Sequence, residues 1–458
     1  MRVPEIDKAI GIEVYATETP GVGGVIRSTV EDFAVEEALV DGSHARIEKV
    51  AEAPALRATL DKQAFLLCVL VKRSWDTFIA IKNIARQLEV TPEHINIAGI
   101  KDAKAVTAQH ITIAHCTIED ASKVNIKDVE IRTVGYFRDR LAPFYLLGNN
   151  FRITIKALNL SEQTIAKRMT AITRELEAVG GIPNFFGHQR FGTTRPITHR
   201  VGKAIIEGNL ENAAMLFLAE ASAYEHPASR QARKQLKATQ DYKQALQDFP
   251  RQLRYERLML VHLAERPTDF VGAFQRLPIK LQVLFVQAYQ SYLFNRFLSE
   301  RIRSGFALNR AEVGDYVVKV ERSGLPLVKA GKLVDDATMA ETNEAIRGGT
   351  MRVALPLVGA KQWLSQGTMG QMEARVLEEE GVKAENFKAR VLPTMRGRGE
   401  LRAIVSPINN FQVQNISRPA DASEMQQATL AFMLLRGSYA TVLLREIMKP
   451  KNPITAGF

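Results

Sequence analysis

The chain has 458 residues, of which 46% are hydrophobic and 24% are charged, and its formal net charge is +11. This composition is typical of a globular protein and excludes a collagen-like, fibrous or wholly disordered chain. The excess of positive charge favours a polyanionic partner, and nucleic acid before membrane.

The length of the apolar runs and the number of cysteines disfavour a membrane protein, a zinc protein and a disulfide-rich protein. The longest apolar run, residues 64–71, is far shorter than the ~20 residues of a membrane-spanning helix. Residues 1–8 carry two acids and a proline instead of the apolar stretch of a signal peptide. Two cysteines, Cys68 and Cys116, cannot form a disulfide framework or a four-cysteine zinc site. We therefore expect a soluble, cytoplasmic protein without a metal site.

Strand-like and helix-like segments alternate in the first part of the chain. Residues 65–71 have the length and β-branched content of a buried strand, and Ser74 is a candidate N-cap for the helix after it. Residues 111–113 and 151–156 alternate apolar and polar side chains, as half-buried strands do. An amphipathic helix is predicted from residue 161 to a glycine pair at 180–181. This order predicts an α/β or α+β domain with a helix-covered sheet.

Basic residues dominate the middle of the chain. Residues 184–192 mix aromatic, amide and glycine residues, and Arg195, Arg200 and Lys203 follow without an intervening acid. Residues 230–257 carry eight basic residues against three acids, which indicates either a solvated helix face or a surface for a polyanion.

The last part of the chain mixes both kinds of element. Residues 280–303 predict a long helix whose aromatic stripe is typical of core packing. Residues 310–360 indicate short strands and turns, and residues 395–400 form a basic glycine turn. Residues 430–449 predict a strand, a turn and a helix. No single segment identifies a site, because an aspartate after a lysine, such as Asp102, is most often a solvated turn residue.

Five motifs in a fixed order carry a family resemblance. Residues 99–109 match G-x-K-D-x-x-A-x-T-x-Q, and residues 184–192 match N-[YF]-F-G-x-Q-R-F-G. Residues 27–35 form an N-terminal motif, residues 281–303 a long central helix, and residues 437–446 a C-terminal motif. Together these motifs span nearly the whole chain, which resembles a longer, archaeal-like member of the TruD-type tRNA pseudouridine synthase family.

The resemblance implies isomerisation of uridine to pseudouridine in RNA, with uridine 13 of tRNA as the expected target and with no cofactor or metal. It implies that Asp102 is the nucleophile acting on a flipped-out uridine. Asn184 would orient the aspartate, and Phe186 would stack on the uracil. Three further catalytic positions of the family match Arg27, Phe33 and Glu37.

The resemblance also implies a fold and a set of RNA contacts. A pseudouridine synthase catalytic domain, residues 1–205 and 410–458, would be an α/β (α+β) domain with a mixed, largely antiparallel sheet. A large α+β insertion domain, residues 206–409, would interrupt it and complete a positively charged cleft. We expect a monomer that binds tRNA and needs no obligate protein partner. The candidate RNA-binding residues are Lys101, Lys104, Gln189, Arg190, Arg195, Arg200 and Lys203.

The chain departs from the family pattern at three positions. Ala103 follows the K-D pair where many members have a second basic residue, Arg27 stands where lysine is common, and Phe185 replaces a frequent tyrosine. The residues alone leave an alternative open, a non-catalytic RNA-binding protein or RNA chaperone with the same basic cleft. Asp102 disfavours that alternative, because a carboxylate in a phosphate-binding cleft weakens binding.

Overall fold

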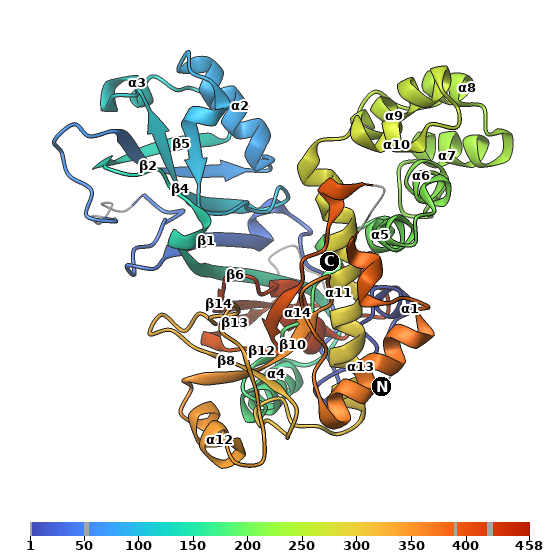
Figure 1. Ribbon diagram of the computed structural model, residues 1–458. Helices are drawn as coiled ribbons and strands as arrows, with labels where there is room; N and C mark the ends of the chain where they lie inside the picture. Colours follow the sequence, from blue (N-terminus) through green and yellow to red (C-terminus); the bar gives the residue numbers. More distant parts are fainter. Residues whose placement is uncertain (1, 50–54, 389–391, 419–424) are drawn as a thin grey trace.

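A mixed eight-stranded sheet organises the computed structural model, which describes residues 2–49, 55–388, 392–418 and 425–458 (Figure 1). The strands lie in the order β13 (Ile408–Ser417), β14 (Gln426–Leu435), β6 (Leu146–Leu158), β1 (Phe33–Leu39), β4 (Val106–Ala114), β2 (Phe65–Arg73) and β5 (Val129–Phe137). The short strand β3 (Ile95–Ile97) pairs with β4 beyond the segment that β1 occupies. Among these pairs β1 and β4 run parallel and the others antiparallel, so the predicted mixed, largely antiparallel sheet is confirmed.

Two helices cover the half of the sheet that contains β1, β6 and β14. Helix α4 (Glu162–Ala178) begins after Ser161, whose Oγ accepts a hydrogen bond from the Thr164 amide at 3.3 Å. It ends before Gly180, which adopts a φ of +91°, as the predicted glycine stop requires. Helix α14 (Ala440–Met448) follows β14 through a tight turn and shares one apolar core with α4 and these strands.

The other half of the sheet, β2, β4 and β5, packs against α2 (Thr77–Gln87) and α3 (Ile118–Ser122). The predicted cap of the first of these helices was wrong. Asp76 caps α2, and its Oδ1 accepts hydrogen bonds from the amides of Phe78 and Ile79 at 2.9 and 3.0 Å. Ser74 instead has a φ of +55° in the preceding turn. An aspartate at this place satisfies two free amides and places its negative charge at the positive helix end.

Residues from 198 onward build a helical layer and a second sheet. The helices are α5 (Thr198–Ile206), α6 (Leu210–Ala219), α7 (Pro227–Thr239), α8 (Tyr242–Asp248), α9 (Arg254–Glu265), α10 (Phe270–Gln275) and α11 (Ile279–Arg303). In Figure 1, α6–α10 form a lobe opposite β2, β5 and α2, and α11 runs through the centre of the view. The four-stranded sheet has the order β11 (Glu400–Ala403), β10 (Met351–Leu357), β8 (Tyr316–Lys319) and β9 (Lys332–Leu333), with α12 (Met339–Arg347) and α13 (Gly367–Glu379) beside it.

Two features of this second sheet were not predicted. Helix α12 lies within the segment expected to hold only strands and turns, and its single fully buried residue, Thr342, explains the weak apolar signal. The sequence did not assign Pro356 to a strand or a turn, and it lies in β10, opposite Leu401 of β11. Strand β8 begins at Tyr316, opposite Ala354, so it does not reach Pro356, whose missing N–H leaves no partner unsatisfied on that side.

The link between the two halves of the molecule is tight. Strand β7 (Ile182–Pro183) pairs with β12 (Val405–Ser406), which leads directly into β13. The predicted domain limits, residues 206 and 409, fall at the last residue of α5 and inside β13. The assignment of residues 206–409 to a separate insertion domain stays a prediction.

Helices α5 and α11 approach so closely that a glycine is required between them. A Cβ added at Gly202 would overlap the backbone carbonyl of Phe285. We therefore expect Gly202→Ala to lower the free energy of unfolding by ~1–3 kcal/mol through overpacking, as measured by urea denaturation. Gly348→Ala is the matched control, because a Cβ there meets only ordinary contacts from 3.4 Å outward. Equal stability of both variants would contradict this account.

Candidate active site

The loop between β3 and β4 carries Asp102, and Arg27 holds its carboxylate. Arg27 Nη2 donates to Asp102 Oδ1 at 3.0 Å, while the Asp102 side chain keeps 34% of its surface exposed. Arg27 Nη1 donates to the carbonyl of Gly457 at 3.1 Å, and its guanidinium lies 4.0 Å from the centre of the buried Phe33 ring. These three sequence-predicted residues, Arg27, Phe33 and Asp102, form what we call the aspartate cluster. Its carboxylate is fixed in direction and still open to a substrate.

Lys72, which sequence analysis missed, holds the backbone of Asp102 from beneath. Its buried Nζ donates to the carbonyls of Asp102 and Trp75, each at 2.8 Å. No carboxylate of the described residues lies within 4 Å of this ammonium, and burial lowers the pKa of Lys72 to about 8. A lysine that continues an apolar strand was the available signal, because such a residue needs a buried partner.

A second buried cation fixes the residue before the aspartate. Lys101 Nζ donates to Glu37 Oε1 at 2.6 Å, and the other carboxylate oxygen of Glu37 accepts from the His110 amide at 2.9 Å. Burial opposes ionisation of Glu37, but the charge and hydrogen bond of Lys101 and the adjacent His110 ring hold the pKa of Glu37 below the ordinary value. Gln109 Nε2 donates to the Gly99 carbonyl at 3.0 Å and ties the loop to β4. Lys101 was predicted to contact RNA, yet it is 4% exposed and points inward.

The other predicted catalytic residues form a separate group around an arginine. Asn184 Nδ2 donates to the Ala403 carbonyl at 2.9 Å, and Asn184 Oδ1 accepts from Arg402 Nη2 at 2.8 Å. The Arg402 guanidinium lies 4.0 Å from the centre of the Phe186 ring, which is 7% exposed. Burial lowers the pKa of Arg402 to about 10, so it stays protonated at neutral pH. We call Asn184, Phe186 and Arg402 the amide cluster, of which sequence analysis missed Arg402.

Buried polar groups hold the segment that carries Phe186. Asn295 of α11 accepts from the Phe186 amide at 2.8 Å and donates to the Phe186 carbonyl at 3.0 Å. The neighbouring helical turn η4 (His188–Arg190) is held by Asp7, whose Oδ1 lies 2.9 Å from His188 Nε2. Arg445 of α14 donates to the other oxygen of Asp7 at 2.6 Å. The N-terminal segment, η4 and α14 are therefore locked together beneath the amide cluster.

No hydrogen bond among the described residues joins the two clusters. Among the described residues, Asp102 forms no hydrogen bond with Asn184, although the asparagine was expected to orient it. The C-terminal residues lie near both groups, since the Gly457 carbonyl binds Arg27 and the Phe458 ring lies beside His188, two positions after Phe186, with ring centres 6.4 Å apart.

The amide cluster lines a cleft of about 860 Å³ that is rich in cations. Its lining includes Asn184 and Phe186 together with residues of β11, the turn 395–400 and the β14–α14 turn. One acid, Glu400, is part of this lining. The lining cations are Arg190, Lys329, Arg396, Arg398, Arg402 and Arg436.

The cations of this cleft differ from most of those predicted from the sequence. Among the described residues, no carboxylate lies within 4 Å of Arg396 or Arg398, and both are exposed. Backbone hydrogen bonds from Ala360 to Gly397 and from Lys361 to Arg398 fix the turn that presents them. The basic glycine turn seen in the sequence is thus held by backbone hydrogen bonds and presents two guanidinium groups that have no ion pair with described residues.

Several predicted RNA-binding cations are already paired within the helical layer. Arg195 donates to the carbonyls of Phe217 and Glu220, and burial lowers its pKa to about 10. Arg200 pairs with Glu220 at 3.0 Å and Lys203 with Glu380 at 2.9 Å. The other predicted RNA-binding residues remain more accessible to a ligand. Lys104 and Gln189 are exposed, and Arg190 lines the cleft while donating to Ser291 and Gln287.

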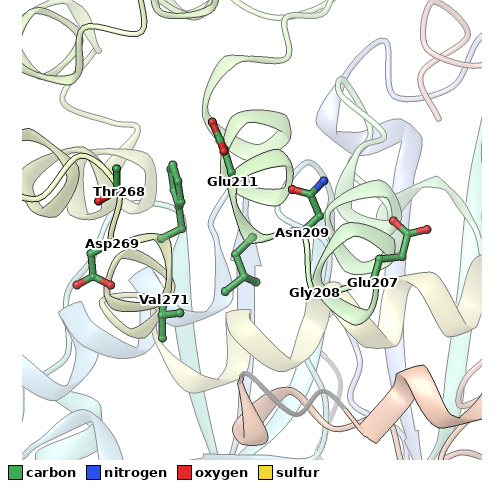
Figure 2. Close-up of a pocket in the computed structure, with 9 residues that line it drawn as sticks. Glu207, Gly208, Asn209, Glu211, Thr268, Asp269 and Val271 are labelled. Carbon is green, nitrogen blue, oxygen red and sulfur yellow. The ribbon is translucent and has the colours of Figure 1, made fainter.

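A second hollow, of about 530 Å³, has the opposite character. It lies between the α5–α6 and α9–α10 connections, where Glu207 and Glu211 stand across from Asp269 (Figure 2). Three acids without a lining cation make it unsuited to a polyanion. Within the described residues there is no group of three or more metal-ligating side chains and no helix long and apolar enough to cross a membrane.

Comparisons with known proteins agree with one another. Residues 9–447 match the family model described as tRNA pseudouridine synthase D (TruD). A Methanosarcina mazei protein named "Probable tRNA pseudouridine synthase D" is 38% identical over 455 residues, which cover 99% of each chain. A Thermococcus onnurineus protein of the same name is 36% identical over 95% of this chain and 97% of its own. A crystal structure of the TruD protein from Methanosarcina mazei matches with a TM-score of 0.83 at 37% identity, over 99% of this chain and 100% of that one.

The buried ammonium of Lys72 gives a prediction about stability. Lys72→Met removes two hydrogen bonds to backbone carbonyls, and we expect it to lower the free energy of unfolding by ~1–3 kcal/mol at neutral pH. Between about pH 8 and 10.5 the unfolded lysine keeps a proton that the folded one has released, so wild type should gain stability relative to Lys72→Met as the pH rises. Urea denaturation across this range measures both effects.

The exposed Lys82 of α2 provides the matched control for this experiment. Lys82→Met should show neither the loss at neutral pH nor the gain above pH 8. A stability difference between wild type and Lys72→Met that stays constant from pH 7 to 10.5 would contradict the assignment.

Proposed function

Because this chain belongs to the tRNA pseudouridine synthase D (TruD) family, we propose that it isomerises uridine to pseudouridine in tRNA, at uridine 13, with Asp102 as the nucleophile. The observation that carries the proposal is the fixed but exposed carboxylate of Asp102, which Arg27 holds by its side chain and Lys72 by its backbone. The proposal includes no metal, no cofactor and no obligate protein partner, and places the enzyme in the cytoplasm as a monomer.

The reaction explains why the carboxylate must be both fixed and open. The bond between uracil N1 and the ribose must break, the base must turn, and uracil C5 must bond to the ribose and lose its proton. A carboxylate that bonds covalently to one fragment, the sugar or the base, keeps that fragment in the site during the turn. Arg27 binds Asp102 Oδ1 at 3.0 Å, and the other carboxylate oxygen has no hydrogen-bond partner among the described residues, so it remains available for the attack.

Base flipping supplies a role for the amide cluster. A stacked uridine is out of reach of a carboxylate, so it must be extruded at a cost of a few kcal/mol. Stacking on a planar side chain recovers ~1–3 kcal/mol of that cost. Phe186 and Arg402 offer such a surface, and Asn184 is held beside them. Glu37 does not contact the base and is a positioning residue, because it binds Lys101, the residue before Asp102.

The unpaired cations of the cleft bind the phosphate groups of the RNA backbone in this proposal. Arg396 and Arg398 carry no ion pair with described residues, so phosphate groups do not have to compete with protein carboxylates for them. We place the phosphate contacts next to the flipped nucleotide on these two side chains, Arg190 and Lys104, rather than on the paired cations of α5.

Tritium release tests the activity and the nucleophile. With a tRNA transcript labelled at uridine C5, wild type should release tritium, and mapping should place pseudouridine at position 13. Asp102→Asn should release none while binding the transcript at least as tightly as wild type, because only the nucleophile is lost. Asp128→Asn, in an exposed turn, should behave as wild type. Tight binding by a wild type that releases no tritium would favour the RNA-chaperone alternative.

The salt dependence of binding tests the phosphate contacts. The double variant Arg396→Gln/Arg398→Gln should reduce the slope of log affinity against log salt by about 0.7–0.9 per lost contact. Turnover at saturating RNA should change little, because the aspartate cluster is untouched. Arg347→Gln, on the exposed end of α12, is the matched control. An unchanged slope in the double variant would place the RNA backbone elsewhere.

A further inference from the structure

Arg402 covers the ring on which a flipped base was expected to stack. Its Cζ lies 4.0 Å from the centre of the Phe186 ring, the separation of two stacked groups. The edges or tilted faces of Phe294 and Tyr439 also contact that ring, with centres 5.7 and 6.2 Å away, and Phe186 is 7% exposed. The cleft therefore meets the guanidinium of Arg402 at the place where the sequence predicted an open aromatic face.

Three hydrogen bonds anchor this guanidinium. Nε donates to the Asn184 carbonyl at 3.0 Å, and Nη2 donates to Asn184 Oδ1 at 2.8 Å and to the Gly437 carbonyl at 2.7 Å. A hydrogen bond from a charged donor changes an equilibrium ~10- to 100-fold, and one stacked base changes binding ~5- to 100-fold. An arriving base thus gains too little to displace Arg402 from the ring.

One edge of the guanidinium remains available. Within the described part of the chain Nη1 has no hydrogen-bond partner, while Nε and Nη2 are both used. Gly437, with a φ of +87°, leaves the space beside it open, since even a Cβ there would lie 3.7 Å from Nη1. An arginine plane is a known stacking surface for unpaired bases, and its N–H groups match the carbonyl oxygens of uracil.

We propose that the extruded uracil stacks on the guanidinium plane of Arg402, which Phe186 backs, and that Nη1 donates to a carbonyl oxygen of the base. This inference rests on the function proposed above and adds a base-contacting residue to it. Phe186 then acts through Arg402 instead of touching the base. The residue comes from β11, more than 200 positions after the motif that supplies Asn184 and Phe186.

The test isolates the contribution of the base to binding. Two tRNA transcripts are compared, one with uridine and one with an abasic site at the position that wild type modifies, and the ratio of their dissociation constants is measured. Wild type should bind the uridine transcript ~5- to 100-fold more tightly. Arg402→Lys keeps the charge but loses the plane and the fork of donors, so its ratio should fall to within about twofold of one. Its affinity for the abasic transcript should be unchanged.

Phe186→Leu distinguishes stacking of the base on the Arg402 guanidinium from direct stacking on the Phe186 ring. The substitution leaves the hydrogen bonds of Arg402 in place. Our proposal predicts a partial fall of the ratio in Phe186→Leu, and it predicts that the double variant has the same ratio as Arg402→Lys alone. A full loss in Phe186→Leu, with the wild-type ratio kept in Arg402→Lys, would show direct stacking on Phe186 and overturn the proposal. Arg352→Lys, on the neighbouring strand and outside the cleft, is the matched control.

Tritium release by wild type on the uridine transcript is measured in parallel. Release together with an unchanged ratio in Arg402→Lys overturns only the role of Arg402. The absence of release, together with a wild-type ratio of one, overturns both this inference and the function on which it rests. Thermal unfolding of each variant confirms that the ratios come from folded protein.

Discussion

The site depends on a carboxylate that is held without being covered. Packing does not cover Asp102, because 34% of its side chain is exposed, as the proposed nucleophile requires. The protein instead fixes the loop from below with two buried ammonium groups. Lys101 pairs with Glu37, which offsets the cost of burying its charge. Among the described residues, Lys72 has only carbonyls as hydrogen-bond partners, and its lowered pKa reflects the cost of burying a charge that no carboxylate pairs with.

The second constraint is that distant parts of the chain must close one site. Asn184 and Phe186 come from the segment after β7, but Arg402 and the turn 395–400 come from the far end of the second sheet. The β7–β12 pair brings these parts together, since β12 lies directly between β11 and β13. The backbone N–H of Asn184 extends the β7–β12 pairing, since it donates to the Ile404 carbonyl at 2.7 Å. The fold thus makes the amide cluster a junction between the two sheets.

Local sequence patterns predicted many of the helices and strands. The apolar stripe and glycine stop of α4, the aromatic stripe of α11 and the strand–turn–helix order near residue 440 were all predicted, because each is set by neighbours in the chain. The motifs also singled out Arg27, Phe33 and Asp102, which the structure brings together in the aspartate cluster. Arg402 escaped notice because its partners are about 220 positions away, and no local pattern distinguishes it from other strand arginines. Lys72 left a weak signal, a cation within an apolar strand.

Charge shows most clearly why a sequence cannot locate a nucleic-acid surface. A net charge of +11 states that cations are in excess but not which of them lack partners. The run from Arg195 to Arg257 has many basic residues, yet Arg195, Arg200 and Arg233 meet acids or carbonyls of the same helical layer. The shorter turn 395–400 contributes two cations that no described acid neutralises. Since counterion release depends on the cations that phosphate can reach, we expect Arg396 and Arg398 to contribute more to RNA binding than the paired Arg195, Arg200 and Arg233.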